Sequence, residues 1–392
     1  MKILLVHNEY GRFSGEEAVF YAVEGLLRSG GHEIHTFVRS SASLPPGWRG
    51  KAKAFVSGIW SRAARREMAA VLDEFQPEVV QIQNLFPLIS PSVIGEIKRR
   101  GIPLVMACHN YRLFCPTGLM LRDGRPCSKC ATGGVSSCIR HNCEGDLPRS
   151  IGYAVRNHVA LRELLGAVDV FTVLSAFQRD RFVDWGIDAG RIAVVPNFID
   201  EQAAHGGNER QAGGDEEMAY VGYAGRVSPE KGVDVLLKAA LRLPEIPFRI
   251  AGHASRMPDL AGGPHVKFTG EIPSAGMAGF YRGARLTVAP SIWFEGMPMV
   301  VVEAMLAGRP VVASSIGGLT DMIVHGITGL LVPPGNDEAL ADAIAALWQD
   351  VDRCTRMGNA AREHVRREFN RERYYERLMS AYGQALRNFR TG

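Results

Sequence analysis

Two glutamates interrupt an apolar stretch, WFEGMPMVVVEAMLAGRP, that runs from Trp293 to Pro310. Glu295 and Glu303 are separated by seven residues that carry no charge. Burying a carboxylate is costly unless it is paired or hydrogen-bonded. The two side chains therefore either face solvent, as ordinary surface glutamates do, or face a ligand that needs hydrogen-bond acceptors. The neighbouring Met, Pro and Val residues favour the ligand.

The local sequence predicts where the two carboxylates lie. Pro298 suits the first turn of a helix and Gly308 suits its C-terminal cap, which predicts a helix over about 298–307. Glu303 then lies in the second turn of that helix. Glu295 lies in the loop before it, directly after the predicted strand RLTVAPS. A carboxylate at the end of a strand is well placed to bind a ligand rich in hydroxyl groups.

A second segment, GYAGRVSPEKGVDVLLKAA, has the residue types of an anion site. Gly225 and Gly232 allow the backbone to approach an anion closely, and Arg226 and Lys231 supply positive charge where a helix begins. The segment lacks the GxxxxGK[ST] pattern of a Walker loop. The alternative is a surface turn with two ordinary cations.

The composition is that of a globular protein. The chain has 392 residues, of which 46% are hydrophobic and 22% charged, and its net charge of +4 is spread too evenly to indicate nucleic-acid binding. The apolar run at the N-terminus is too short for a signal peptide, and no run is long enough for a membrane span. We therefore expect a cytoplasmic protein, with peripheral contact to the inner face of the membrane as an option.

Apolar, β-branched runs alternate with helical patterns along the whole chain. KILLVH, EIHTFV and VVQIQN are examples in the first half, and MAYVGYAG, RLTVAPS and GLLVP in the second. This alternation predicts an α/β protein with two doubly wound, parallel-sheet domains. The polar, Gly-rich stretch from Asn197 to about Met218 is predicted to be the linker between them. Because ligands bind beyond the carboxyl ends of parallel strands, the expected site lies in a cleft between the domains.

The motifs together resemble the retaining glycosyltransferases of family 4, which have the GT-B fold. The resemblance is carried by GRVSPEKGVDVLLKA, VKFTGEI and APSIWFEGMPMVVVEAMLAGRPVVASSIGGLTDMIVHGITGLLVPPGN, and in the first half by GRFSGEEAVFYAVEGLLRSGGHEIHTF. It covers nearly the whole chain. It implies two Rossmann-like domains facing across a cleft: an acceptor-binding domain over 1–197, joined by a C-terminal crossing helix over about 371–392, and a nucleotide-sugar-binding domain over 198–370.

The resemblance also implies roles for individual residues. Arg226 and Lys231 would bind the donor diphosphate, Glu303 the ribose, and Glu295 the hydroxyls of the donor sugar. The remaining positions that match the family's donor site are Gly225, Gly296, Met297, Gly15 in the N-terminal loop, and His109, which would border the donor sugar. His109 could instead be a histidine satisfied at a strand end.

The implied reaction moves a hexosyl unit from a nucleoside diphosphate sugar, such as a UDP-sugar, to a sugar or lipid-linked acceptor, in bacterial cell-surface polysaccharide or glycolipid synthesis. His109, Arg226, Lys231 and Glu295 are the expected catalytic residues. Fixed cations aimed at the leaving diphosphate could replace a divalent ion, so no catalytic cofactor is expected. A front-face mechanism is favoured because no residue is an obvious nucleophile, although Glu295 is a weak candidate. A sugar-nucleotide epimerase of the same fold and a non-catalytic sugar-nucleotide-binding scaffold are the alternatives.

Five of the seven cysteines lie close together in the sequence, and Cys127 and Cys130 have the spacing of a zinc knuckle. Cys115, Cys138 and Cys143 could complete a structural zinc site in an insertion over 115–143. Free or redox-active thiols and a disulfide are the alternatives.

Two further segments allow alternative interpretations. Seven Lys or Arg residues and no acid lie between Arg39 and Arg66, and apolar residues recur at helical spacing over 51–75. This pattern fits an amphipathic helix lying on an anionic membrane surface, or equally a helix packed on the first sheet with a solvated basic rim. Asp350 and Asp352 form a DxD tripeptide, which is interpreted as charge at a helix end rather than as a metal site.

Overall fold

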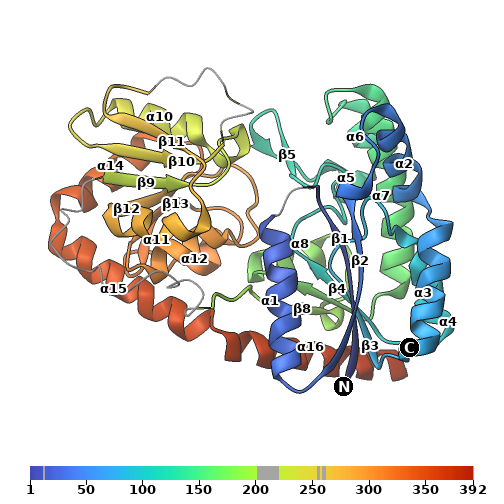
Figure 1. The fold of residues 1–392 in the computed structure, drawn as a ribbon. Helices are drawn as coiled ribbons and strands as arrows, with labels where there is room; N and C mark the ends of the chain where they lie inside the picture. Colours follow the sequence, from blue (N-terminus) through green and yellow to red (C-terminus); the bar gives the residue numbers. More distant parts are fainter. Residues whose placement is uncertain (12–13, 201–219, 254–256, 258–261, 392) are drawn as a thin grey trace. The chain divides into compact units, whose positions relative to one another are not determined.

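The chain forms two compact units, and each contains one parallel sheet. The computed structural model describes residues 1–11, 14–200, 220–253, 257 and 262–391 (Figure 1). The first unit comprises 1–120, 128–196 and 374–392, and the second comprises 121–127 and 197–373. The predicted linker falls largely on 201–218, outside the described residues.

The first sheet has six parallel strands, in the order β2-β1-β3-β4-β7-β8. The strands are β1 Lys2–Glu9, β2 Glu33–Ser40, β3 Val79–Ile82, β4 Leu104–Cys108, β7 Val170–Val173 and β8 Ile192–Val194. Ile3, Leu4, Leu5 and Val6 of β1 are completely buried, as expected for a strand covered on both faces. The chain order reverses between β1 and β3, and the carboxyl ends of strands at such a switch point border ligand sites in α/β folds.

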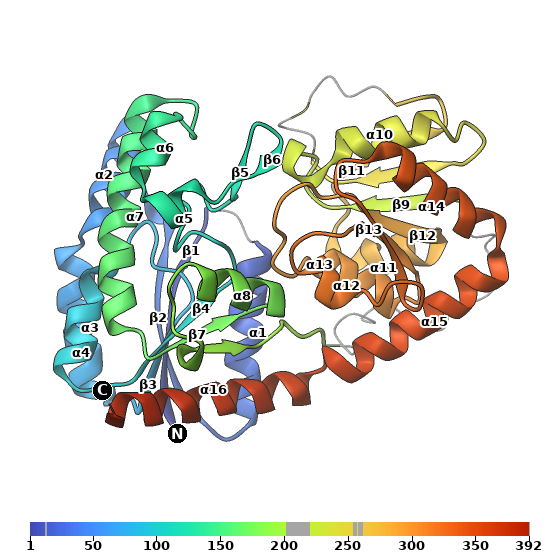
Figure 2. The same cartoon turned by 180° about the vertical axis from the view of Figure 1, so that it is seen from behind.

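Helices cover both faces of the first sheet, with α1 and α8 on one side and α3, α4 and α7 on the other (Figures 1 and 2). The α-helices of this unit are α1 Gly15–Ser29, α2 Trp48–Ile59, α3 Arg62–Phe75, α4 Ile94–Arg99, α5 Lys129–Gly133, α6 Ser136–Arg140, α7 Leu147–Ala167 and α8 Ala176–Asp184. The 3-10 helices are η1 Ser41–Ser43, η2 Pro91–Val93 and η3 Ala189–Arg191. A capping box fixes the start of α1: Ser14 caps the helix and Glu17 bonds back to the Ser14 backbone.

The second sheet also has six parallel strands, in the order β11-β10-β9-β12-β13-β14. The strands are β9 Tyr220–Ala224, β10 Phe248–Ala251, β11 Val266–Gly270, β12 Ala284–Ala289, β13 Val311–Ser314 and β14 Gly329–Val332. This is the doubly wound order of dinucleotide-binding folds, with its switch point between β9 and β12. Two short antiparallel strands, β5 Leu121–Arg122 and β6 Arg125–Pro126, form a separate hairpin.

The core of the second unit lies between its sheet and the helices α10 and α14. The helices of this unit are η5 Pro229–Lys231, α10 Val233–Leu241, α11 Ser274–Gly283, α12 Met299–Leu306, α13 Leu319–Met322, α14 Asp337–Gln349 and α15 Val351–Glu368. The predicted helix over 298–307 is confirmed as α12, with Pro298 directly before it and Gly308 at a φ of +73° just after it. Asp350 caps the N-terminus of α15, which confirms that the DxD tripeptide is helix-end charge.

The last helix, α16 Arg371–Thr391, packs on the first unit, as a crossing helix should. The Tyr382 hydroxyl donates to Gln81 in β3, and Asn388 Nδ2 donates to the Asp169 carbonyl oxygen at 3.1 Å. Tyr375 and His32 are joined by a hydrogen bond of 2.8 Å. The two ends of the sequence are therefore joined within one unit.

The prediction of a single helix over 51–75 is wrong. The helix breaks at Trp60, whose backbone is extended (φ −153°), and α3 starts anew with Ser61 accepting from the Ala64 N–H. The α3 helix buries Met68 and Leu72, as expected of a helix packed on the sheet. The α2 helix leaves Trp48, Phe55 and Val56 exposed, so contact with a membrane stays a prediction for α2 alone. No helix among the described residues is long and apolar enough to span a bilayer.

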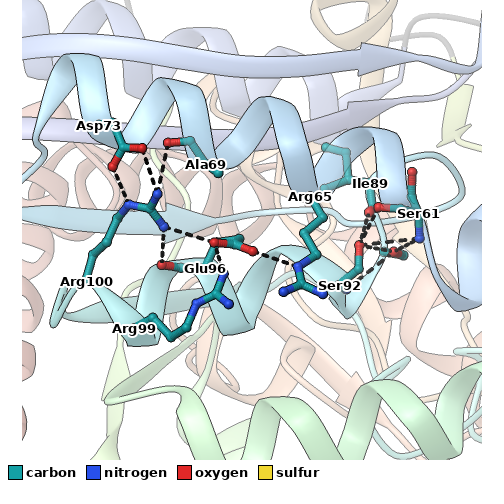
Figure 3. Close-up of polar contacts among 10 residues, drawn as sticks. Ser61, Arg65, Ala69, Asp73, Ile89, Ser92, Glu96, Arg99 and Arg100 are labelled. Carbon is teal, nitrogen blue, oxygen red and sulfur yellow. Dashed lines mark hydrogen bonds and ion pairs between the residues drawn. The ribbon is translucent and has the colours of Figure 1, made fainter.

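One carboxylate joins α3 to α4 in the first unit. Glu96 lies 7% exposed between three arginines: Arg65 Nε donates to it at 2.6 Å, Arg100 Nη1 at 3.0 Å, and Arg99 also pairs with it (Figure 3). Arg100 also pairs with Asp73 at 2.7 Å. Hydrogen bonds from these arginines, that of Arg65 first, lower the pKa of Glu96 to about 2.

We expect Glu96→Gln to destabilise the protein by about 1–3 kcal/mol near neutral pH, because three charge-assisted contacts become weaker. A lowered folded-state pKa contributes stability above the unfolded value of about 4.5, and this contribution is lost as the pH falls towards about 2. The difference in the free energy of unfolding between the parent protein and E96Q should therefore become smaller in acid. Urea unfolding at a series of pH values measures it, with the exposed Glu74→Gln on α3 as the control. An equal loss of stability at all pH values would contradict the assignment.

Candidate functional site

A buried ion pair lies at the switch point of the second sheet. Lys231 Nζ donates to Glu295 Oε1 at 2.7 Å, and the two side chains are 16% and 5% exposed. Ser291 Oγ donates to the same oxygen at 2.6 Å. The Lys231 ammonium also lies 5.4 Å from the centre of the Trp293 ring. Burial acts to raise the pKa of Glu295, but Lys231 and Ser291 outweigh it and the pKa is lowered.

Glycines allow the loops that carry Lys231 and Glu295 to approach each other closely. The loop after β9 ends at Gly232, which has a φ of +68°, and a Cβ there would lie 1.9 Å from the Pro290 carbonyl oxygen in the loop after β12. Gly317 approaches Glu295 similarly, since a Cβ would lie 2.5 Å from the Glu295 nitrogen. Only glycine fits such contacts, so the backbone holds Lys231 and Glu295 close to each other.

The second cation of this loop is paired as well, but it is accessible. Arg226 Nη1 lies 3.4 Å from Glu230 Oε1, with the arginine 55% and the glutamate 4% exposed. The Arg226 carbonyl oxygen accepts from the Tyr223 hydroxyl at 2.7 Å, and the Glu230 carbonyl oxygen accepts from the Ile292 N–H at 3.0 Å. Glu230 thus positions Arg226 from the interior while the guanidinium remains exposed to a ligand.

Glu303 has different surroundings from Glu295. It lies on α12, and its Oε2 accepts from the hydroxyl of Tyr281, on α11, at 2.9 Å. Burial raises the pKa of Glu303, and the Tyr281 hydrogen bond acts in the opposite direction. Tyr281 itself is 3% exposed. A carboxylate with one fixed donor keeps acceptor capacity for further hydroxyl groups.

The structure places seven of the predicted donor-site residues in the second unit, and Lys231 and Glu295 are in direct contact. The seven are Gly225, Arg226, Lys231, Glu295, Gly296, Met297 and Glu303. Sequence reasoning missed Ser291, Glu230 and Tyr281. Glu230 is adjacent in sequence to Lys231, and Ser291 lies four residues before Glu295, which was the available signal. Tyr281 has no such signal, because its contact with Glu303 depends on how α11 packs.

The other two predicted residues lie in the first unit. Gly15 is the first residue of α1, directly after the cap Ser14. His109 follows β4, its Nε2 has no hydrogen-bond partner among the described residues, and burial lowers its pKa to about 4. The His109 imidazole is therefore neutral at physiological pH and can exchange a hydrogen bond with a hydroxyl group.

The predicted zinc ligands receive no support from the described residues. Cys115, Cys127, Cys130, Cys138 and Cys143 form no disulfide with one another, and no group of three or more Cys, His, Asp or Glu side chains in the described part of the chain is arranged to hold a metal. Burial and neighbouring thiols, Cys143 first, raise the pKa of Cys138 to about 12. A structural zinc therefore stays a prediction.

Known protein families match both halves of the chain. Residues 13–203 match the family "Glycosyltransferase Family 4", and residues 208–364 match "Glycosyl transferases group 1". A D-inositol 3-phosphate glycosyltransferase from Nocardia farcinica is 26% identical over 93% of this chain and 83% of its own length. The protein of that name from Kribbella flavida is 31% identical over 51% of this chain, which spans about half of that relative (53%).

Solved structures show the same fold. Sucrose-phosphate synthase from Thermosynechococcus elongatus superposes with a TM-score of 0.68 at 19% identity, covering 98% of both chains. Anabaena HepE in complex with UDP-glucose superposes with a TM-score of 0.61 at 19% identity, covering 97% of this chain and all of its own (100%).

We expect Lys231→Met to destabilise the second unit by about 3–5 kcal/mol near neutral pH, because it leaves Glu295 buried without its cation. Without Lys231, burial raises the folded-state pKa of Glu295 above its unfolded value, so the variant loses stability as the pH rises through that range. In the parent protein the pKa of Glu295 is lowered, so the contribution of Glu295 to the free energy of unfolding instead increases as the pH rises. The difference in the free energy of unfolding between the parent protein and Lys231→Met, measured by urea unfolding, should therefore grow from acid to neutral pH. The exposed Lys238→Met on α10 is the control, and a deficit that does not change with pH would contradict the expectation.

Proposed function

Because the chain belongs to glycosyltransferase family 4 and has the GT-B fold, we propose that it moves a hexosyl unit from a nucleoside diphosphate sugar to a sugar or lipid-linked hydroxyl, with retention of anomeric configuration. Lys231 held against buried Glu295 at the switch point of the second sheet is the observation that carries the proposal. Solved neighbours in complex with UDP and UDP-glucose favour a UDP-sugar as the donor. A role in cell-surface polysaccharide or glycolipid synthesis accords with such an activity.

The charges of the second unit suit a departing nucleoside diphosphate. Breaking the sugar–phosphate bond develops negative charge on the diphosphate, and Arg226 and Lys231 supply positive charge at the end of β9. The Lys231 ammonium has three donors and uses one on Glu295. It can therefore bind phosphate without releasing the carboxylate. Arg226 is exposed and has most of its guanidinium N–H groups available.

The two carboxylates bind the two parts of the donor on either side of the diphosphate, the sugar and the ribose. Glu295 has a lowered pKa and is ionised, so it can accept from sugar hydroxyls next to the diphosphate. Glu303, oriented by Tyr281, can accept from the ribose. Retention by a front-face path needs no enzyme nucleophile, because the leaving phosphate deprotonates the acceptor hydroxyl.

The decisive experiment screens UDP-, GDP- and ADP-sugars for thermal stabilisation and then follows diphosphate release from the best donor. Release that depends on an added acceptor, with an α-linked product from an α-linked donor by NMR, supports the proposal. Conversion of the donor without acceptor would instead indicate an epimerase. Binding without any turnover over a broad acceptor panel would indicate a scaffold.

We expect Arg226→Gln to lower kcat/KM for the best donor by about 100-fold. A cation at about 4 Å contributes roughly 4 kcal/mol at an effective dielectric of 20, and exposure of Arg226 reduces this value. Arg242→Gln, another exposed arginine of the same unit, should be nearly neutral. Activity should also survive EDTA. Loss of activity in EDTA with the fold intact, or equal effects of R226Q and R242Q, would contradict the role of Arg226.

We expect Tyr281→Phe to raise KM for the donor about tenfold with little change in kcat, because Glu303 loses the donor that orients it. The pKa of Glu303, already raised by burial, should rise further. Donor affinity needs the ionised carboxylate, so its fall at acid pH should begin at a higher pH in Y281F. The pH profile of kcat/KM measures this, with Tyr375→Phe in the first unit as the control. A variant with an unchanged profile would show that Tyr281 only fills space.

A further inference from the structure

Part of the surface of the first unit carries large apolar side chains that the fold does not cover. Among the described residues fourteen large apolar side chains are exposed, and six of them lie on just two helices. They are Trp48, Phe55 and Val56 on α2 and Leu147, Ile151 and Val155 on α7. Single exposed apolar residues are ordinary on a protein surface, whereas a group of them marks an interaction site. We call these six residues the apolar face.

The α2 helix contributes little to the core of its unit. Its buried residues are two glycines. One side of the helix carries Trp48, Ala52, Phe55, Val56 and Ile59. Trp48 on this side is 74% exposed. A helix whose large apolar side chains remain in water gains little from burial within its own fold, so these side chains are available to a partner.

Phe55 joins the apolar side of α2 to that of α7. Its ring covers Gly152 so closely that a Cβ on this glycine would lie 2.0 Å from Phe55 Cε2. Leu147, Ile151 and Val155 recur every four residues on α7, and the last two of them flank Gly152 in the sequence. Figures 1 and 2 show α2 and α7 side by side. The six side chains therefore belong to one surface rather than to two.

The helices that carry the apolar face also carry positive charge. The α2 helix contains no acidic residue, and α7 contains none before Glu163. The Arg49 guanidinium carbon lies 5.8 Å from the centre of the Trp48 ring, so a cation lies next to the most exposed aromatic side chain of the face. Asp146, just before α7, caps that helix. The exposed cations of the two helices are Arg49, Lys51, Lys53, Arg149 and Arg162.

This combination of side chains distinguishes between two kinds of partner. Tryptophan and other apolar residues beside Lys and Arg, without acids, are typical of helices that lie in the interface of an anionic bilayer. Tryptophan in particular prefers the level of the lipid headgroups. Protein interfaces are instead depleted of lysine, whereas Lys51 and Lys53 of α2 lie in sequence between Trp48 and Phe55. The charge and the residue types therefore favour a membrane over a protein.

We propose that the apolar face docks the first unit on an anionic phospholipid bilayer, with its apolar side chains among the lipid headgroups and the neighbouring cations bound to lipid phosphates. The docking surface needs α7 as well as α2, because the two helices share the face. The proposal does not rest on the transferase function, since the residues of the proposed donor diphosphate site are in the second unit.

The test is co-sedimentation of the full chain with two kinds of vesicle, phosphatidylcholine alone and equal parts of phosphatidylcholine and phosphatidylglycerol. The protein should sediment with the anionic vesicles, and its bound fraction should fall as salt is added, because salt screens exposed charges. Binding to phosphatidylcholine alone should be at least about tenfold weaker, because the attraction to anionic lipid is lost. Equal recovery with both kinds of vesicle would overturn the proposal.

Variants of the apolar residues test whether both helices take part. Trp48→Ser should lower the partition coefficient for anionic vesicles about tenfold, because less apolar area leaves water on binding. The double variant Ile151→Ser with Val155→Ser should do the same on α7. Leu241→Ser, at an exposed leucine of α10 in the second unit, is the matched control and should bind like the parent protein. All four side chains are exposed, and thermal unfolding of each variant verifies that it is folded.

A second set of variants tests the charge. Lys51→Gln combined with Lys53→Gln should lower the partition coefficient at least about tenfold, because each cation near an anionic surface adds to the attraction. The effect should disappear at high salt, where these charges no longer contribute. Lys238→Gln, at an exposed lysine of α10, is the control. An equal effect of K238Q would contradict a specific basic surface.

The remaining outcomes also decide the matter. If W48S weakens binding while the α7 variant binds like the parent protein, the two-helix surface is wrong and α2 acts alone. Absence of binding to either kind of vesicle overturns membrane docking altogether. Sedimentation velocity then assigns the face to a second copy of this chain if the parent protein self-associates and W48S does not.

Discussion

The carboxylate of Glu295 can stay ionised in the interior of the second unit only because Lys231 and Ser291 donate to one of its oxygens. This requirement fixes the local structure around it. The loops after β9 and β12 must approach closely enough for an ion pair of 2.7 Å, and Gly232 permits that approach because any side chain there would collide with the Pro290 carbonyl group. The proposed donor site is thus held by a pair whose partners come from the segments after β9 and β12, on either side of the switch point.

Both units use the same feature of parallel sheets for different chemistry. In each, the strand order reverses beside the first strand of the sheet, and the segments that follow the flanking strands contribute the polar residues. The second unit places cations and acids there in contact with each other. The first unit leaves the side-chain amide of Gln83 and the Nε2 of His109 without hydrogen-bond partners among the described residues, around a small cavity. The arrangement in the second unit suits a charged leaving group. The arrangement in the first unit suits a ligand that brings its own hydroxyl groups.

Much of this could be predicted from the sequence, because the relevant signals are local. The alternation of strands and helices, the helix after Glu295 and the capping role of Asp350 all depend on neighbouring residues. The break at Trp60 was missed because apolar spacing continues through it, whereas the capping hydrogen bond of Ser61 starts a new helix. The pairing of Lys231 with Glu295 and the contact of Tyr281 with Glu303 join residues from separate elements. Motifs can name such residues, but their distances depend on packing of the whole unit.

Glu295 and Glu303 show how different surroundings shift the pKa values of two identical side chains in opposite directions. Burial acts to raise the pKa of both, yet of the two only Glu295 has a cation within hydrogen-bond distance among the described residues, so its pKa falls while that of Glu303 rises. Nucleophilic attack would convert the Glu295 carboxylate into a neutral glycosyl ester and so break its ion pair with the Lys231 ammonium. Breaking such a pair leaves an uncompensated charge in the interior, at a cost of about 3–5 kcal/mol. This cost opposes nucleophilic attack by Glu295 and favours a front-face path, in which the carboxylate stays in place and only the substrates move.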